Sequence, residues 1–271
     1  MEYIKLNNKI EMPLVGLGVF RIEDDQMDQV IKSAYEAGYR HFDTAQMYHN
    51  EASLGKACKQ LGIRREELLF TTKIDNQNQG YEKTLKSFTE SCKKLQVDYV
   101  DQLLIHWPGQ DAKRTAETWK AFEKLYEEGL VRIIGLSNFT LKHISILEKS
   151  GNIMPMTNQI ERNPFVTQLE LIPALQAKNI APIAWAPLRR GNCLNETIIK
   201  IAEKHQKTPA QVLLRWNIES EVMVIPCSKN PIRQLENLEL FDFKLADSEI
   251  DAINKLHTGE RTSFDPNTYD F

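Results

Sequence analysis

Eight short apolar segments alternate with amphipathic segments along most of the chain, and this alternation constrains the fold more than any other feature. The apolar segments are residues 14–20, 39–43, 68–73, 99–106, 131–138, 156–160, 180–187 and 222–228. They are apolar on both faces, as buried parallel strands are. Each is followed by a helix-like segment, at residues 25–37, 51–60, 82–94, 115–128, 141–149, 169–177, 196–204 and 233–238.

Eight successive strand–helix units predict an α/β fold, the (β/α)8 or TIM barrel. A doubly wound parallel sheet is the alternative, and it needs a G-x-G-x-x-G turn after an early strand. Gly16 and Gly18 are followed by Val19, Phe20 and Arg21 and not by a third glycine. The barrel is therefore the predicted fold.

Three further elements are expected outside the eight units. Residues 3–6 and 10–13 read as an N-terminal β-hairpin around Asn7 and Asn8, because Asn tolerates the positive φ of tight turns. Residues 209–219 form an added helix, and the tail from Leu245 contains another. No linker or low-complexity stretch divides the chain, so residues 1–271 are predicted to form a single domain.

Composition excludes several classes of protein. The chain is 42% hydrophobic and 26% charged, with a net charge of −3 and interspersed signs, which argues against a nucleic-acid partner. No apolar run approaches the roughly 20 residues that span a bilayer, and no basic and apolar leader is visible, so a cytoplasmic protein is the default expectation. The four cysteines, Cys58, Cys92, Cys193 and Cys227, have no metal-ligand spacing, so neither a metal nor a disulfide framework is expected.

Polar residues end nearly every predicted strand. In a TIM barrel the active site lies at the carboxyl ends of the strands, so these side chains should share one rim. They are Asp43, Lys73, His106, Ser137, Asn138, Gln159, Trp185 and Ser228. Each alone is compatible with a solvated strand end, but their joint occurrence indicates a functional rim.

The segment HFDTAQMYHNE at residues 41–51 carries the first part of this rim. A tyrosine acts as a general acid near neutral pH when a cation lowers its pKa from about 10. Lys73, on the strand after Asp43, is expected to supply that charge to Tyr48, while Asp43 keeps Lys73 protonated. His106, from the next strand, is placed to hydrogen-bond a substrate carbonyl oxygen.

The stretches GYRHFDTAQMYHNE, TTK, DQLLIHWP, IGLSNF, NQIE, AWAPL and IPCSKNPIRQLEN resemble the aldo-keto reductases, in the family's order over essentially the whole chain. The resemblance implies NADPH-dependent reduction of aldehydes and ketones by a tetrad matching Asp43, Tyr48, Lys73 and His106. Tyr48 would donate the proton, and His106 would orient the carbonyl. The implied cofactor contacts are the carboxamide-binding Ser137, Asn138 and Gln159, the ring-stacking Trp185, the phosphate-binding Ser228 and Arg233, the adenine-binding Glu236 and Asn237, and also Leu188 and Lys229.

The chain departs from the family at positions near the cofactor. Cys227 replaces a lysine that usually contacts the 2′-phosphate or its ribose, so NADPH is expected while NADH is left open. Lys229 is expected to compensate, and Arg233 suits a phosphate because its guanidinium donates two hydrogen bonds at once. Ala186 replaces a common serine near the pyrophosphate, where Arg189 and Arg190 are candidates to supply charge.

Phe20, Met47 and Trp107 are expected to line an apolar pocket for a small carbonyl substrate. The tail after Leu256 is short for the family, which predicts an open, permissive site. The pattern resembles bacterial reductases of the diketogluconate and methylglyoxal type, and family members are often monomers.

Two other functions stay open at this stage. Lys73 at a strand end could be the Schiff-base nucleophile of an aldolase, although a neighbouring Asp43 would keep the amine protonated. A non-catalytic NADPH-binding subunit of the same fold is the second alternative, and the complete tetrad argues against it. A metal-dependent hydrolase is disfavoured because no strand ends in H-x-H.

Overall fold

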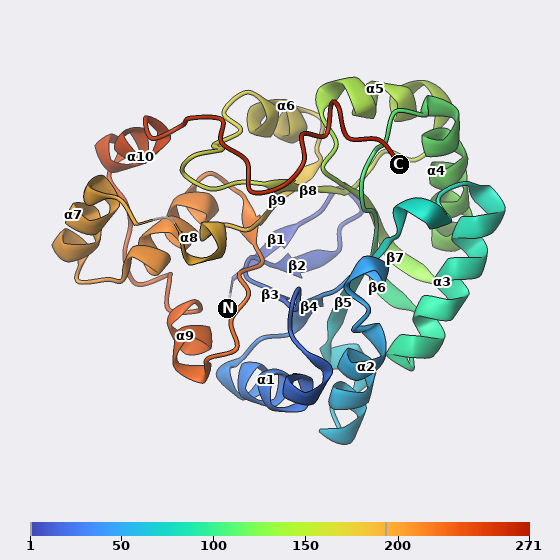
Figure 1. The fold of residues 1–271 in the computed structure, drawn as a ribbon, viewed down its shortest axis with the longest axis horizontal. Helices are drawn as coiled ribbons and strands as arrows, with labels where there is room; N and C mark the ends of the chain where they lie inside the picture. Colours follow the sequence, from blue (N-terminus) through green and yellow to red (C-terminus); the bar gives the residue numbers. More distant parts are fainter. Residues whose placement is uncertain (1, 193) are drawn as a thin grey trace.

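The computed structural model describes residues 2–192 and 194–271, so Cys193 lies outside the described residues. Eight parallel strands pair in chain order, and Figure 1 shows them at the centre of the molecule with helices around them. The strands are β3 (Leu17–Gly18), β4 (His41–Asp43), β5 (Leu69–Ile74), β6 (Val100–Ile105), β7 (Val131–Ser137), β8 (Thr157–Glu161), β9 (Ala181–Trp185) and β10 (Met223–Val224).

Backbone hydrogen bonds join the first strand region to the last. Val15 pairs with Val224 in a parallel bridge. The amide of Gly16 donates to the carbonyl of Val224 at 2.9 Å, and the amide of Val224 donates to the carbonyl of Leu14 at 2.9 Å. The sheet therefore closes on itself, which confirms the predicted barrel in place of the doubly wound alternative.

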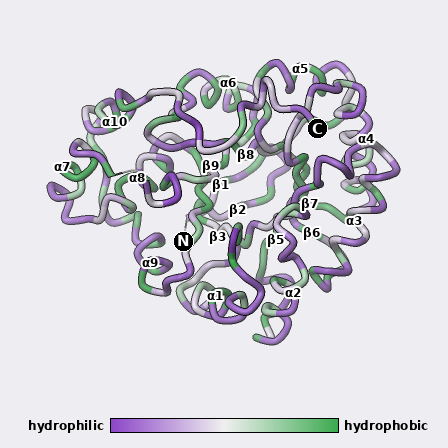
Figure 2. Tube along the Cα trace, in the orientation of Figure 1, coloured by the Kyte–Doolittle hydropathy of each residue, from purple (hydrophilic) through white to green (hydrophobic). Residues whose placement is uncertain are grey.

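The helices surround the barrel because each has one apolar face. In α1 (Asp24–Ala37) the buried residues Met27, Val30, Ile31 and Ala34 follow helical spacing, and Figure 2 shows hydrophilic and hydrophobic stretches alternating along the outer helices. The other helices are α2 (Glu51–Gln60), α3 (Tyr81–Leu95), α4 (Ala112–Glu127), α5 (Leu141–Ser150), α6 (Leu171–Ala177), α7 (Glu196–His205), α8 (Pro209–Glu219), α9 (Pro231–Glu236) and α10 (Asp247–Asn254). The added helix and the tail helix are thus present as α8 and α10.

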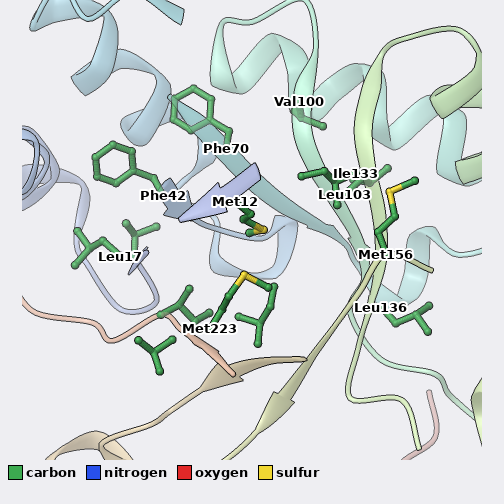
Figure 3. Close-up of a cluster of buried hydrophobic side chains, with 14 of the residues drawn as sticks. Met12, Leu17, Phe42, Phe70, Val100, Leu103, Ile133, Leu136, Met156 and Met223 are labelled. Atoms are coloured by element: carbon green, nitrogen blue, oxygen red, sulfur yellow. The ribbon is translucent and has the colours of Figure 1, made fainter. Parts of the chain in front are cut away.

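The predicted hairpin is present as β1 (Tyr3–Lys5) and β2 (Glu11–Pro13). The side chains of Asn7 and Asn8 donate to three backbone carbonyls at the amino ends of barrel strands, those of Pro155, Asn179 and Arg132. Met12 is fully buried, and Figure 3 draws it among side chains of the barrel strands. The hairpin therefore covers the end of the barrel opposite to the carboxyl ends of the strands.

The hairpin turn uses a different residue from the one expected. Positive φ falls on Lys9 (72°) and not on Asn7 or Asn8. The turn spans three residues, closed by a bond from the Leu6 amide to the Ile10 carbonyl, and such turns place the left-handed residue last. The two asparagines contribute through their side chains instead.

The first and last strands are much shorter than the apolar segments that predicted them. β3 covers two residues of 14–20, because the chain turns after Val19, whose carbonyl accepts from the Ile22 amide. β10 covers two residues of 222–228, and Pro226 has no amide hydrogen for further pairing. Among the described residues no helix combines the length and apolar character needed to cross a membrane.

Candidate active site

A cavity of about 1070 Å³ lies at the carboxyl ends of the strands and extends to α8 and α9. Every predicted site residue except Lys73 and Arg189 lines it; Arg189 Nη2 instead lies 2.6 Å from Glu260 Oε1. These lining residues are Phe20, Asp43, Met47, Tyr48, His106, Trp107, Ser137, Asn138, Gln159, Trp185, Leu188, Ser228, Lys229, Arg233, Glu236 and Asn237. Strand order brings them together, because parallel strands place their carboxyl ends on one rim.

Lys73 lies beneath the cavity and reaches it through its ammonium group. Lys73 Nζ is 2.6 Å from Asp43 Oδ1, 2.9 Å from the carbonyl oxygen of Thr44 and 3.3 Å from the hydroxyl of Tyr48. These three contacts match the three donors of an ammonium group. The Lys73 side chain is fully buried, so its charge acts through its neighbours.

The Lys73 environment favours the protonated amine. Burial alone would lower the pKa of Lys73, but the charge of Asp43 and the contacts with Asp43 and Tyr48 outweigh it and raise that pKa. A Schiff-base nucleophile needs a neutral amine with access to substrate. The geometry of Lys73 therefore argues against the aldolase alternative.

The expectation that Lys73 gives Tyr48 a lowered pKa is wrong in its net direction. Burial raises the pKa of Tyr48 above its ordinary value of 10.0, and the nearby Lys73 ammonium offsets this only in part. Lys73 does lower the pKa of Tyr48, as predicted, but the burial of the phenol has the larger effect, and the sequence does not show that burial. The consequence is a Tyr48 hydroxyl that is protonated at neutral pH.

Tyr48 ends a single 3-10 turn, η1 (Gln46–Tyr48), which was not predicted from the sequence. The side chain of Gln46 ties this turn to the segment after β5, because its Oε1 accepts from the amide of Asp75 at 2.8 Å. Its Nε2 donates to Ser91 Oγ in α3 at 2.9 Å. A three-residue turn has no periodicity to detect, so only the neighbouring contacts define it.

His106 faces Tyr48 across the cavity floor. Their ring centroids are 5.6 Å apart at an interplanar angle of 75°. Burial and the Lys73 charge hold the pKa of His106 well below its ordinary value of 6.5, so the imidazole is neutral at physiological pH. Its Nδ1 atom is buried and has no hydrogen-bond partner among the described residues.

A buried polar chain crosses the barrel one layer below the tetrad, where sequence reasoning proposed nothing. His41 Nε2 lies 2.8 Å from Thr71 Oγ1, and Thr71 donates to Gln102 Oε1 at 2.6 Å. Gln102 in turn donates to Thr157 Oγ1 at 2.7 Å. Burial lowers the pKa of His41 to about 3, so it adds no charge beside Lys73.

Gln159 and Asn138 link the predicted nicotinamide end of the cavity to the tetrad. Gln159 Nε2 donates to Asp43 Oδ2 at 2.7 Å, opposite the oxygen that contacts Lys73. Asn138 Oδ1 accepts from Trp185 Nε1 at 2.8 Å, and Asn138 Nδ2 donates to the carbonyl of His106 at 3.0 Å. These bonds orient the Trp185 ring and tie it to the backbone that carries His106.

The remainder of the cavity suits an anionic ligand. Four cationic side chains line it, and among the residues that the structure describes none of the four forms an ion pair with a carboxylate. They are Arg21, Arg190, Lys229 and Arg233. Unpaired cations around a cavity of this size fit the phosphates of a dinucleotide, with Glu236 and Asn237 beside them to meet polar groups of a base.

Cys227 lines the same part of the cavity and carries no charge there. Cys227 is exposed to the cavity, but the surrounding protein partly desolvates its thiol and raises its pKa, so the thiol is neutral at physiological pH. Its Sγ lies 3.5 Å from the carbonyl oxygen of Phe20. Cys227 therefore supplies no charge to a phosphate, which would depend on the cationic side chains that line the cavity.

The C-terminal tail contributes residues to the substrate end of the cavity, which the sequence did not predict. Ser263, Phe264 and Tyr269 line the cavity beside Phe20, Met47 and Trp107. Trp107 packs edge-on against Phe264 at 6.0 Å and against Tyr269 at 5.0 Å, measured between ring centroids. The tail thus supplies part of the cavity wall, while Phe264 stays 57% exposed, so the expectation of an open site stays a prediction. Aromatic residues in an otherwise polar tail were the available signal.

Known proteins resemble this chain over almost its whole length. The profile described as "Aldo/keto reductase family" matches residues 14–258. The chain is 45% identical over 267 residues to a glyoxal reductase of Bacillus subtilis, covering 98% of this chain and 96% of that protein.

Two solved structures are also similar. MGS-M4, an aldo-keto reductase from a Medee basin deep-sea metagenome library, has a TM-score of 0.95 and 42% identity, covering 99% of this chain and 100% of its own. A mutant of Gox0644 in complex with NADPH has a TM-score of 0.94 and 39% identity, covering 100% of this chain and 99% of its own.

Proposed function

Because the chain belongs to the aldo/keto reductase family, we propose that it reduces small aldehydes or ketones to alcohols with NADPH and that Tyr48 is the proton donor. The observation that carries the proposal is the contact chain from Asp43 through Lys73 to Tyr48, at 2.6 Å and 3.3 Å. A buried acid–cation–phenol chain at the edge of a cavity is suited to passing one proton to a reacting oxygen.

NADPH, when bound, supplies the hydride that adds to the carbonyl carbon. Tyr48 gives its hydroxyl proton to the carbonyl oxygen, which becomes the hydroxyl of the alcohol. The phenolate left on Tyr48 is stabilised by the Lys73 ammonium, which Asp43 keeps charged. The raised pKa of Tyr48 keeps the proton in place until the oxygen becomes basic enough to take it.

His106 orients the carbonyl in this proposal. A neutral imidazole has one N–H donor. Because Nδ1 has no acceptor among the described residues, we place the hydrogen on Nε2, which then donates to the carbonyl oxygen. Such a donor stabilises the negative charge that develops on that oxygen.

The preference for NADPH over NADH is assigned to Arg233, with Ser228 and Lys229. Arg233 has no acidic partner among the described residues and lines the cavity on α9. Its guanidinium suits the 2′-phosphate, which only NADPH carries. The relative named as a glyoxal reductase supports small aldehydes as the substrate class.

Replacement of Tyr48 by Phe tests the proposal. The variant removes only the hydroxyl, so we expect kcat for methylglyoxal reduction to fall by about 10²–10⁴-fold, the usual contribution of a general acid. NADPH affinity, measured by quenching of protein fluorescence, should stay within about twofold in the same preparation.

Turnover of Tyr48→Phe near the wild-type rate would exclude Tyr48 as the proton donor. Failure of the wild-type protein to oxidise NADPH with any aldehyde or ketone in a panel would instead favour the non-catalytic alternative. Fluorescence titration with NADPH and NADH decides the cofactor, and tighter binding of NADH would contradict the assignment of Arg233.

A further inference from the structure

The tail after α10 returns across the barrel and supplies part of the cavity wall. Figure 1 shows it in red, running from α10 to a carboxyl end beside α4. Its residues Phe264 and Tyr269 stack with ring centroids 4.2 Å apart and an interplanar angle of 5°. Both rings contact Trp107, so the aromatic wall of the cavity depends on where the tail is held.

Glu161, at the end of β8, holds the beginning of this wall. Glu161 Oε1 accepts from the amide of Thr262 at 2.6 Å and from Thr262 Oγ1 at 2.7 Å. Glu161 Oε2 lies 3.8 Å from Arg261 Nη1. The Glu161 carboxylate is buried, and hydrogen bonds to a buried anion are stronger than those to a neutral acceptor.

Glu161 lies between the predicted nicotinamide end of the cavity and the tail that lines its substrate end. It stands two residues after Gln159 on β8 and is the register partner of Trp185 on β9. Thr262, its tail partner, is followed directly by the cavity-lining residues Ser263 and Phe264. Glu161 itself does not line the cavity, so it acts through the tail and not on the substrate.

We propose that Glu161 is a positioning residue that fixes the tail over the substrate end and thereby sets the affinity for carbonyl substrates with large apolar substituents. The inference rests on the proposed function. Each hydrogen bond that the Glu161 carboxylate accepts comes from Thr262, so its loss frees the residue that directly precedes the wall. The residues before it keep the bonds from the amides of Thr258 and Gly259 to the Phe165 carbonyl and the ion pair of Glu260 with Arg189. The far end keeps separate bonds from Gln110 and Arg114 to residues 269–271.

The test compares Glu161→Gln with a matched control, Glu123→Gln. Glu123 is also a buried carboxylate, and it lies on α4, away from the cavity. Its Oε1 accepts from the amides of Asn152 and Ile153 at 2.5 and 2.7 Å. Phenylglyoxal and methylglyoxal are the substrates, since they share the reacting aldehyde and differ in the size of the apolar group.

For Glu161→Gln we expect KM for phenylglyoxal to rise about five- to tenfold, while KM for methylglyoxal changes less than about twofold. The values of kcat and of the NADPH dissociation constant should stay within about twofold of the wild type. Thr262→Val should repeat this pattern, Thr262→Ser should keep wild-type values, and Glu123→Gln should leave both KM values unchanged. The assignment would be overturned if Glu161→Gln impaired both substrates equally and also lowered kcat and NADPH affinity. A change of either KM in Glu123→Gln would overturn it as well.

Amide hydrogen exchange tests the anchor without turnover. In Glu161→Gln the amide of Thr262 should exchange at least tenfold faster than in the wild type, while amides of β8 keep their protection. Unchanged exchange at Thr262 overturns the proposal whether or not the protein is active. An inactive wild type with faster exchange in the variant refutes the reductase assignment and with it the effect on substrate affinity.

Discussion

Lys73 and Tyr48 show what residue identity does and does not determine. Residue types and strand positions indicated that Asp43, Lys73 and Tyr48 meet at one strand end, and the structure places them in contact. The net pKa of Tyr48 was predicted in the wrong direction, since burial outweighs the effect of Lys73. The depth of a side chain depends on residues from many segments, so no local motif reports it.

The shifted pKa values of Tyr48 and His106 predict how the rate of reduction depends on pH. The pKa of Tyr48 lies above 10.0 and that of His106 well below 6.5, so between these pH values Tyr48 stays protonated and His106 stays neutral. We expect kcat for aldehyde reduction at saturating NADPH to be constant within about twofold from pH 6.5 to 9.5, and to fall only above pH 10. Steady-state rates across this range check it, and an inflection near pH 6 to 7 in kcat would contradict the assigned protonation states.

At the scale of elements, long periodic helices were located to within a few residues, whereas short turns were missed. η1 carries Tyr48 and is held by Gln46, whose partners come from the segment after β5 and from α3. The tail is irregular in sequence but ordered against Glu161 and Trp107. Elements without their own periodicity are defined by contacts that are distant in sequence.

Glu249 of α10 joins this helix to α7 through Lys204 and His205, and we expect its charge to stabilise the folded protein. Burial alone would raise the pKa of Glu249, but hydrogen bonds from Lys204, the Ala246 amide and His205 outweigh it and lower the pKa to about 2. The folded pKa is below the ordinary value of 4.5, so this contribution is complete above pH 4.5 and is lost as the pH falls towards 2. Glu249→Gln should lower the free energy of unfolding by about 1 kcal/mol at pH 7.

Urea unfolding at pH 7 and pH 4 checks this value. The difference between wild type and Glu249→Gln should be smaller at pH 4, because there the unfolded chain, with a pKa of 4.5, binds a proton at Glu249 that the folded protein does not. Glu196→Gln is a suitable control, because Glu196 contacts Lys200 on an exposed face of α7. A difference that grows as the pH falls would show that the Glu249 charge does not stabilise the docking.

At the scale of the molecule, barrel closure joins segments from both ends of the chain. Residues 14–18 bond to Val224 and Pro226, and the N-terminal hairpin bonds to residues that precede β8 and β9. The largest buried cluster contains residues from Leu6 to Leu240. These connections underlie the prediction that residues 1–271 behave as one domain.

A single domain should unfold in one transition. Tryptophan fluorescence reports on residues 107, 119, 185 and 216, in both halves of the chain, while far-UV circular dichroism reports on the helices. The two urea curves should share a midpoint to within experimental error. Separate midpoints would indicate independent units, and size-exclusion chromatography in the same buffer tests the prediction of a monomer.

The sequence by itself determined the barrel and indicated the four residues that we propose as the tetrad, because alternating apolar segments and polar residues at strand ends are local patterns. Only the tertiary structure decided that Lys73 lies fully buried beneath the cavity, that Gln159 bonds to Asp43, and that Glu161 bonds to a tail that lines the substrate end. These features come from contacts between segments up to 116 residues apart, and burial and hydrogen-bond partners at that separation leave no pattern in neighbouring residues.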